Sequence, residues 1–322
     1  MRALIVSNML PDERHPERGR FVRDQVAALA GLEDVEVELF EFPPGPRALA
    51  RAALALRARH GGTSTLSRRP STPPLDVMHA HFGLTAWPAF AVAARMRAVT
   101  LHGTDLSHPR TRLATAAALP ALDLLGAVSS SLIANIPGSA ARARAKVLPC
   151  GVDVERFHPL PRAQARAELG LDPGRPYVLF AADPTRAEKR HDRARELTHA
   201  LGVELRTLGG IEPERVPLWV NGANAVLVPS EREGFGLAVL EALACDVPVL
   251  ATPVGVHAEA LEDVPGALCA PFELTRWRTA LEPLLLESDP RVPGRASAMR
   301  FSATAMAERV RSAWLETLER GD

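Results

Sequence analysis

Short apolar stretches alternate with amphipathic stretches along most of the chain. The apolar stretches suit buried strands, whereas the intervening ones space their apolar residues as helices do. This alternation is typical of parallel βαβ units. A first series of strands is predicted at Ala3–Ser7, Val35–Phe40, Val77–Ala80, Val99–His102, Leu124–Val128 and Lys146–Pro149. A second series is predicted at Tyr177–Ala181, Leu205–Leu208, Ala225–Val228, Pro248–Ala251 and Ala267–Cys269. Helices are predicted between most strands, for example at Phe21–Ala30, Leu237–Ala244 and Glu273–Leu286.

A proline-rich segment between the two series predicts two domains. This segment, DVERFHPLPRAQARAELGLDPGRP, contains four prolines, and its start is interpreted as an interdomain linker. We expect an N-terminal domain at 1–155 and a C-terminal domain at 156–322, with a final helix at about 301–322 packed back on the first domain. Each domain should be a doubly wound α/β sheet that binds ligands outside the carboxyl ends of its strands.

Composition and charge narrow the function classes. The 322 residues are 47% hydrophobic and carry a formal net charge of zero, so no global field attracts nucleic acid. The three cysteines are odd in number and lack metal-ligand spacing, which suggests a reducing compartment. The opening MRALIVSNML is too short for a signal peptide, and no apolar run approaches a membrane span. We therefore expect a cytoplasmic protein.

Charge is distributed unevenly along the chain. Residues 1–155 carry a net charge of +4, which leaves −4 for the remainder. The stretch between Phe42 and Leu75 has no acid and six arginines, namely Arg47, Arg51, Arg57, Arg59, Arg68 and Arg69. Its central part, PRALARAALALRARH, predicts a basic amphipathic helix. Two interpretations stay open: a solvated surface helix, or a peripheral contact of Arg47–Arg69 with anionic lipid at the inner face of the plasma membrane.

Several cofactor and metal signatures are missing from the sequence. No G-x-G-x-x-G follows the first strand, and neither a Walker A segment nor an Asp-x-Asp is present. His79 and His81 in HAH are expected to point to opposite faces of a strand, with a core or strand-end role rather than a metal-binding one. No metal and no cofactor are expected.

The segment EREGFGLAVLEALA at 231–244 combines a glycine-rich turn with two carboxylates eight positions apart. It must turn the chain from a strand into a helix that starts near Phe235. The free N–H groups and the dipole of the first helical turn suit a diphosphate, and Gly234 and Gly236 let the backbone approach it.

The two glutamates of this segment suit a sugar nucleotide. Glu241 would lie on an otherwise apolar helix, where the vicinal hydroxyls of a ribose could pair with it. Glu233 in the turn could reach the hydroxyls of a sugar beyond the phosphates. The alternative is a capping glutamate followed by a solvent-facing helix residue.

The longer segment EREGFGLAVLEALACDVPVLATPVG closely resembles the E-x₇-E segment of retaining glycosyltransferases of family four. Three more segments resemble motifs of this family, in the family's order: LIVSNMLPDERHPERGRFVRDQVAAL, VTLHGTDL and VLPCGVDVERFHP. The resemblance implies the α/β GT-B fold, two facing Rossmann-like doubly wound domains with a cleft between them.

The resemblance also implies the reaction. A sugar would pass from a nucleoside diphosphate sugar, such as a UDP-sugar, to an acceptor hydroxyl with retention of configuration and without a metal. The segments HAHFGL and LHGTDL are similar to those of members that build cell-surface polysaccharides, which implies a sugar or lipid-linked acceptor. A nucleotide-sugar 2-epimerase of similar architecture and a catalytically idle sugar-nucleotide-binding protein stay open as alternatives.

Carried over residue by residue, the family's donor site falls on the E-x₇-E segment. Glu241 would bind the nucleotide ribose and Glu233 the donor sugar. The backbone facing the diphosphate would be that of the glycine-rich turn, namely Gly234, Phe235, Gly236 and Leu237.

The family also has an arginine and a lysine that neutralise the leaving diphosphate. Lys189 in FAADPTRAEKRHD matches the lysine, and Arg186 is its nearest basic partner, with Arg190 as the alternative. Asp183 stands nearer the usual arginine position. In the first domain Gly19 matches the loop glycine, His102 matches the histidine near the reacting sugar, and Asp105 is a candidate acceptor contact.

Overall fold

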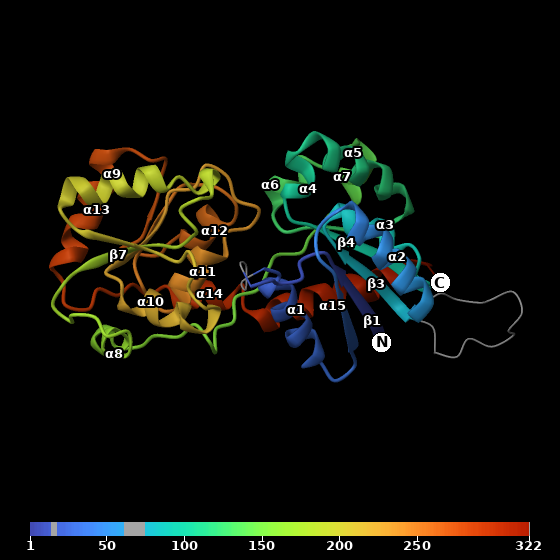
Figure 1. Cartoon of the computed structure of the whole chain (residues 1–322), viewed down its shortest axis with the longest axis horizontal. Helices are drawn as coiled ribbons and strands as arrows, with labels where there is room; N and C mark the ends of the chain where they lie inside the picture. Colours follow the sequence, from blue (N-terminus) through green and yellow to red (C-terminus); the bar gives the residue numbers. More distant parts are fainter. Residues whose placement is uncertain (14–17, 61–74, 322) are drawn as a thin grey trace, which may run out of the picture. The chain divides into compact units, whose positions relative to one another are not determined.

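The computed structural model describes residues 1–13, 18–60 and 75–321, which form two compact units (Figure 1). The first unit comprises Met1–Gly151 together with Ala303–Asp322, and the second comprises Val152–Ser302. The chain therefore passes between the units after residue 151, four residues before the expected division, and again after residue 302.

The first unit contains a six-stranded parallel sheet in the order β2-β1-β3-β4-β5-β6. Its strands are β1 Arg2–Ser7, β2 Glu36–Glu41, β3 Leu75–His81, β4 Ala94–Leu101, β5 Leu124–Ala127 and β6 Lys146–Val147. Strand β4 begins five residues before the predicted Val99, because Arg95 and Arg97 interrupt the apolar run there. Those residues still alternate with buried Met96 and Ala98, which is the pattern of a strand with one covered face.

Helices cover this sheet, and one of them comes from the end of the chain. The helices of the first unit are α1 Arg20–Ala30, α2 Pro46–His60, α3 Ala86–Ala89, α4 Thr104–Ser107, α5 Pro109–Ala118, α6 Ser130–Ile133, α7 Ser139–Arg144 and α15 Ala303–Gly321. In Figure 1 the red α15 lies beside the blue α1. Val22 of α1 and Trp314 of α15 share one core with Ile5 and Val77 of the sheet. Burial of these apolar side chains holds α15 on the first unit.

The second unit contains a five-stranded parallel sheet in the order β11-β10-β9-β7-β8. Its strands are β7 Tyr177–Phe180, β8 Glu204–Thr207, β9 Ala225–Val228, β10 Val249–Ala251 and β11 Leu268–Cys269. Its helices are α8 Arg162–Glu168, α9 His191–Leu201, α10 Val216–Gly222, α11 Leu237–Ala244, α12 His257–Leu261, α13 Leu274–Leu286 and α14 Arg295–Met299. The two parallel sheets with their helices confirm the predicted α/β class.

The basic amphipathic helix is confirmed as α2, which spans the predicted segment from Pro46 to His60. Its Ala52 and Leu56 are buried, so the opposite face carries most of its arginines outward. Arg68 and Arg69 lie outside the described residues. None of the described helices has the length and apolarity that a membrane span requires.

Candidate active site

The strand order of the second sheet creates a crevice at its carboxyl edge. Strands β7 and β9 are neighbours, but the chain leaves β7 toward β8 and leaves β9 toward β10, on opposite sides. Such a reversal parts the two following loops, and doubly wound sheets bind their ligands there. Lys189 lies in the loop after β7, and Glu233 lies in the loop after β9.

Lys189 and Glu233 form an ion pair at this crevice. Nζ of Lys189 is 2.8 Å and 2.7 Å from the two carboxylate oxygens of Glu233. Only 15% of the Lys189 side chain and 7% of the Glu233 side chain are exposed. Ser230 adds a hydroxyl that donates to the same carboxylate at 2.7 Å. Either charge alone would be costly to bury, so each one depends on the other.

A tight glycine turn joins Glu233 to α11. The helix begins at Leu237, as predicted, and Gly236 precedes it with a φ of 108°. A Cβ on Gly236 would lie 2.4 Å from Nε2 of His257, and a Cβ on Gly255 would lie 2.2 Å from the carbonyl oxygen of Phe235. Both positions therefore require glycine, because two loops meet here with no room for a side chain.

The ring of His257 packs against this turn at Gly236. Its Nδ1 lies 2.8 Å from the Thr252 carbonyl oxygen, which can only accept, so Nδ1 carries the proton. Its Nε2 is then unprotonated, and this buried nitrogen has no hydrogen-bond partner among the described residues. Burial lowers the pKa of His257, although the charge of Glu233 opposes the shift. The Thr252 hydroxyl donates in turn to the Ser230 carbonyl, which links the ends of β10 and β9.

The other predicted donor-site residues lie around the crevice. Arg186 bonds to Glu188 with its Nε at 2.9 Å and Nη2 at 2.7 Å, and Arg190 bonds to Asp192. Both arginines follow β7, as Lys189 does. Glu241 is half-buried in α11, between Leu240 and Ala242, and it has interactions of its own.

The first sheet has its own reversal between β1 and β3, and the predicted residues of the first domain gather at its carboxyl edge. Gly19, which precedes α1, has a φ of 71°, and a Cβ there would lie 2.4 Å from the Met9 carbonyl oxygen. His81 ends β3 and His102 follows β4, with Nδ1 of His81 2.9 Å from Nε2 of His102.

The histidines of HAH share one face of β3, so the expectation that they point to opposite faces is wrong. The rings of His79 and His81 stack with their centroids 5.3 Å apart and their planes 13° apart. Residues i and i+2 of a strand lie on the same side of the sheet, which is the physical reason. His79 accepts a hydrogen bond from Nε1 of Trp314 at 3.0 Å.

Burial keeps these imidazoles neutral. It lowers the pKa of His81 to about 3, and it holds the pKa of His102 well below its usual value, with His81 and His79 adding to the effect. Phe82, which follows His81, has a φ of 73°, and its ring centroid lies 4.6 Å from that of His102. A positive φ is strained for a phenylalanine, and such strain gathers at functional sites.

Asp105 organises the turn that carries His102. Its carboxylate accepts hydrogen bonds from the backbone N–H groups of His102, Gly103 and Gly83. Asp105 is 3% exposed, and burial raises the pKa of its carboxyl against the effect of these donors.

Comparison with known proteins identifies the family. A model of the family described as glycosyl transferases group 1 matches residues 167–299. D-inositol 3-phosphate glycosyltransferase of Frankia alni is 30% identical over 295 residues, which cover 71% of this chain and 72% of that protein. The chain belongs to the group 1 glycosyltransferases.

Other matches agree with this family and its fold. The enzyme of the same name from Nocardia farcinica is 34% identical over 215 residues, and the match covers 55% of this chain but only 46% of that relative. Among solved structures, sucrose-phosphate synthase of Thermosynechococcus elongatus aligns over 99% of this chain and 100% of its own, with a TM-score of 0.72 and 19% identity. Anabaena HepE in complex with UDP and glucose aligns over 98% and 100%, with a TM-score of 0.68 and 16% identity. The predicted GT-B fold is confirmed.

The geometry of this glycosyltransferase adds three residues that the sequence did not single out as functional. Ser230 and His257 support Glu233 and its turn, and His81 bonds to His102. Ser230 lies two residues after the predicted strand end at Val228, so its position was a usable signal. His257 lies 24 residues beyond Glu233, and only the pairing of β9 with β10 brings the two together.

A double-mutant cycle tests the contact between Gly236 and His257. Gly236→Ala should lower the free energy of unfolding by about 2 kcal/mol, because the new methyl group meets the ring at a strained φ. In a His257→Ala background the same change should cost about 1 kcal/mol less. Urea unfolding of the four proteins measures this coupling. Gly202→Ala, at a φ of 63° with open space around it, is the control for backbone strain alone. Strictly additive costs would contradict the contact.

Proposed function

We propose that this protein transfers a sugar from a nucleoside diphosphate sugar to an acceptor hydroxyl, with retention of configuration and without a metal. The observation that carries the proposal is the ion pair of Lys189 and Glu233 at the strand reversal, beside the glycine turn that opens α11. The family supplies the reaction type, and these residues supply its donor site. The donor and the acceptor would be the two substrates, and no cofactor would take part.

Loss of the sugar leaves negative charge on the diphosphate. Lys189 would neutralise it, together with Arg186 or Arg190 and with the N–H groups of the turn from Gly234 to Leu237. The donor thereby draws Lys189 away from Glu233. The freed Glu233 carboxylate can then accept hydrogen bonds from the sugar hydroxyls, while Ser230 still holds it in place.

The nucleoside would lie along α11 and the loops after β7 and β8. Glu241 would accept hydrogen bonds from the two ribose hydroxyls. A Cβ on Gly209 would lie 3.0 Å from Cδ of Pro184 and 3.6 Å from Cα of Asp183, so these two loops pack on each other. These loops would form a surface next to the ribose site, on which the nucleotide base could pack.

The first unit would supply the acceptor side. His102 would contact the reacting sugar, and Asp105 would act on the acceptor through the turn that it holds. Gly19, where a Cβ would meet the Met9 carbonyl oxygen, would allow the tight turn of the loop that faces the donor. In this scheme no side chain becomes covalently attached to the sugar.

A thermal-shift screen of nucleotide sugars, starting with UDP-sugars, finds the donor. A donor at 100 times its dissociation constant adds about 2.7 kcal/mol to stability. Transfer, or slow hydrolysis of that donor, with unchanged rate in EDTA then supports the proposal. Release of a free 2-epimer without any acceptor would indicate an epimerase, and binding with no turnover would indicate an idle binding protein.

Lys189→Ala should lower turnover by about 10²–10³-fold at saturating donor, because it removes a positive charge where negative charge develops. Arg186→Ala and Arg190→Ala are the matched comparisons, since both arginines lie in the same loop. The true partner of Lys189 should show a loss of similar size. Wild-type turnover in Lys189→Ala, with loss in either arginine variant, would show that the leaving-group residue is wrongly assigned.

Glu241→Ala should weaken binding of the nucleoside diphosphate by about 1.5–3 kcal/mol, the range for hydrogen bonds to a charged group. Isothermal titration calorimetry measures the change. Glu282→Ala, which removes an exposed carboxylate from α13, is the control for loss of charge alone. Equal affinity in the wild type and in Glu241→Ala would rule out the ribose contact.

We further propose that α2 binds an anionic lipid surface and so brings the enzyme to a lipid-linked acceptor. Arg47, Arg51 and Leu54 follow one another at helical spacing and form one exposed face, with Leu54 71% exposed. Arg57 is also exposed, and α2 itself carries no acid. Arg59 differs, because its Nη2 lies 2.8 Å from the Glu38 carboxylate.

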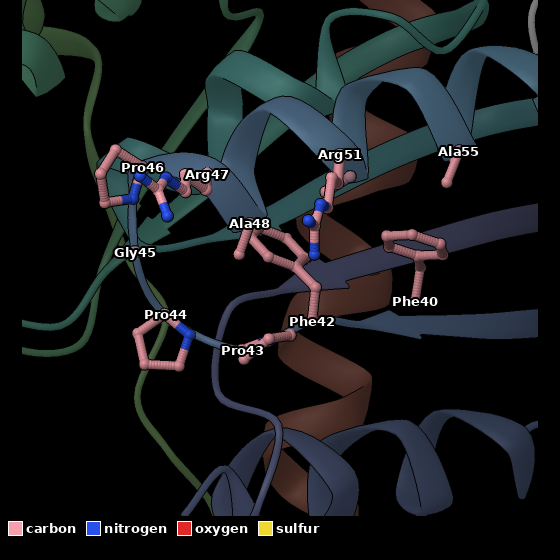
Figure 2. A pocket seen from close by; sticks show the side chains of 11 residues that line it. Phe40, Phe42, Pro43, Pro44, Gly45, Pro46, Arg47, Ala48, Arg51 and Ala55 are labelled. Atoms are coloured by element: carbon pink, nitrogen blue, oxygen red, sulfur yellow. The ribbon is translucent and has the colours of Figure 1, made fainter.

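A groove between α2 and the edge strand β2 adds apolar surface beside these cations. Its volume is about 540 Å³, and apart from Arg47 and Arg51 its lining is apolar or glycine. Figure 2 shows both arginines on the helix side of the groove and the rings of Phe40 and Phe42 on the strand side. Apolar walls next to guanidinium groups match the chains and headgroups of anionic lipids.

Changing Arg47, Arg51 and Arg57 together to Gln should abolish sedimentation with phosphatidylglycerol vesicles in low salt. Near an anionic surface each arginine contributes about 1 kcal/mol, and salt screens the attraction. Arg59→Gln is the matched control and should bind as the wild type does, because Glu38 already neutralises Arg59. Phosphatidylcholine vesicles should bind neither protein. Failure of the wild type to sediment at low ionic strength would leave α2 as a solvated face.

A further inference from the structure

We propose that His81 is a positioning residue that holds the His102 ring as its Nδ1–H tautomer, so that His102 presents an N–H donor to a substrate oxygen. The inference rests on the proposed function, because it concerns the side chain that we place beside the reacting sugar. It assigns the direction of one buried hydrogen bond.

The two rings meet at the carboxyl edge of neighbouring strands. His81 lies opposite Thr100 in the register of β3 and β4, and His102 follows two residues later. The ring planes are 27° apart, and Nδ1 of His81 lies 2.9 Å from Nε2 of His102. His81 is fully buried, whereas His102 is half-buried. The bond therefore occupies Nε2 of His102 and leaves its Nδ1 for another partner.

Both rings are neutral, which restricts the bond to two arrangements. Burial keeps the pKa of each histidine below its usual value, so neither ring carries a second proton near neutral pH. One ring must then donate and the other must accept. Either His81 donates from Nδ1, and His102 is protonated on Nδ1, or His102 donates from Nε2, and His81 is protonated on Nε2.

The buried nitrogen on the far side of His81 decides between them. Nε2 of His81 is buried and has no hydrogen-bond partner among the described residues. If His102 donated, this nitrogen would be an orphaned N–H, whereas if His81 donates it is only a bare lone pair. Buried N–H groups without a partner are rarer than under-satisfied acceptors in native proteins, so His81 donates and His102 accepts at Nε2.

The neighbouring histidine is fixed independently. Trp314 donates to Nδ1 of His79, so the proton of His79 is on Nε2, which lies 2.8 Å from the Thr100 hydroxyl oxygen. His79 therefore uses both of its ring nitrogens within the core and has none to offer His81. Its ring only stacks on His81, which limits rotation of the His81 ring.

Nitrogen-15 NMR of the unliganded wild-type protein tests the tautomer directly. Histidine is labelled, and the signals of His102 are identified by their loss in His102→Gln. We expect the two-bond correlation pattern of a ring protonated on Nδ1. A pattern with the proton on Nε2 of His102 would overturn the proposal, and this arm needs no activity, so it stands even if no donor is ever found.

Two variants of His81 test the consequence for catalysis. His81→Leu should lower kcat by about 10–100-fold through loss of orientation, with KM for the donor within about twofold of the wild type. His81→Asn keeps an N–H near the position of Nδ1 and should restore kcat to within about threefold. His79→Asn is the control, since it disturbs the same ring stack but should leave the His102 tautomer unchanged. An unaltered kcat in His81→Leu, or an equal loss in a well-folded His81→Asn, would refute the positioning role.

Discussion

The reversal of strand order within each parallel sheet is the constraint on which the rest depends. In a parallel sheet, the loops that follow the strands all lie at the carboxyl edge of the sheet. A crevice forms at this edge only where the loops after two neighbouring strands lead to opposite sides. The reversals lie between β1 and β3 and between β7 and β9. His81 ends β3, beside the first reversal, and Lys189 and Glu233 lie in the loops after β7 and β9, on the two sides of the second. The residues of the proposed site therefore lie at the openings of the two sheets.

Both openings are supported by buried polar groups that are nearly, but not fully, satisfied. His257 and His81 each use one ring nitrogen and leave the other buried without a partner among the described residues. A buried nitrogen without a partner costs stability, and one such nitrogen lies beside each of the two openings. The low pKa values of the two histidines also link stability to pH. The unfolded chain binds protons at His81 and His257 that the folded chain does not bind, so stability is lost as the pH falls from about 6.5 toward the folded pKa values.

Much of the fold could be predicted because its signals are local. Strand β9 and helix α11 have the predicted ends, since an apolar run bounded by Pro229 and a glycine turn leaves little choice. Strand β4 was predicted too short because its first half alternates arginine with apolar residues, a weaker signal than a continuous run. The E-x₇-E segment likewise lies in one stretch of sequence, so Glu233 and Glu241 could be named from it.

The residues that could not be predicted depend on pairing between distant segments. His257 reaches Gly236 only because β10 lies next to β9, and Trp314 reaches His79 only because α15 returns to the first unit. Arg59 could not be separated from Arg47 and Arg51 by sequence, because its partner Glu38 lies on β2. The arrangement of His79 and His81 could have been predicted from the sequence, because residues two apart on a strand lie on the same face. The expectation of opposite faces misapplied this rule.

The ion pair of Lys189 and Glu233 shows how one site can serve two states. Without a ligand each charge compensates the other, so neither is buried alone. In the proposed reaction, a diphosphate would offer Lys189 a second anion, and the donor sugar would offer Glu233 several hydroxyl groups. This exchange would leave Lys189 paired with an anion and Glu233 hydrogen-bonded, provided that phosphate and sugar bind together. A nucleoside diphosphate without its sugar would pair with Lys189 but leave the Glu233 carboxylate without Lys189 or sugar hydroxyls, so under the proposed function the pair would favour the intact donor over the nucleoside diphosphate product.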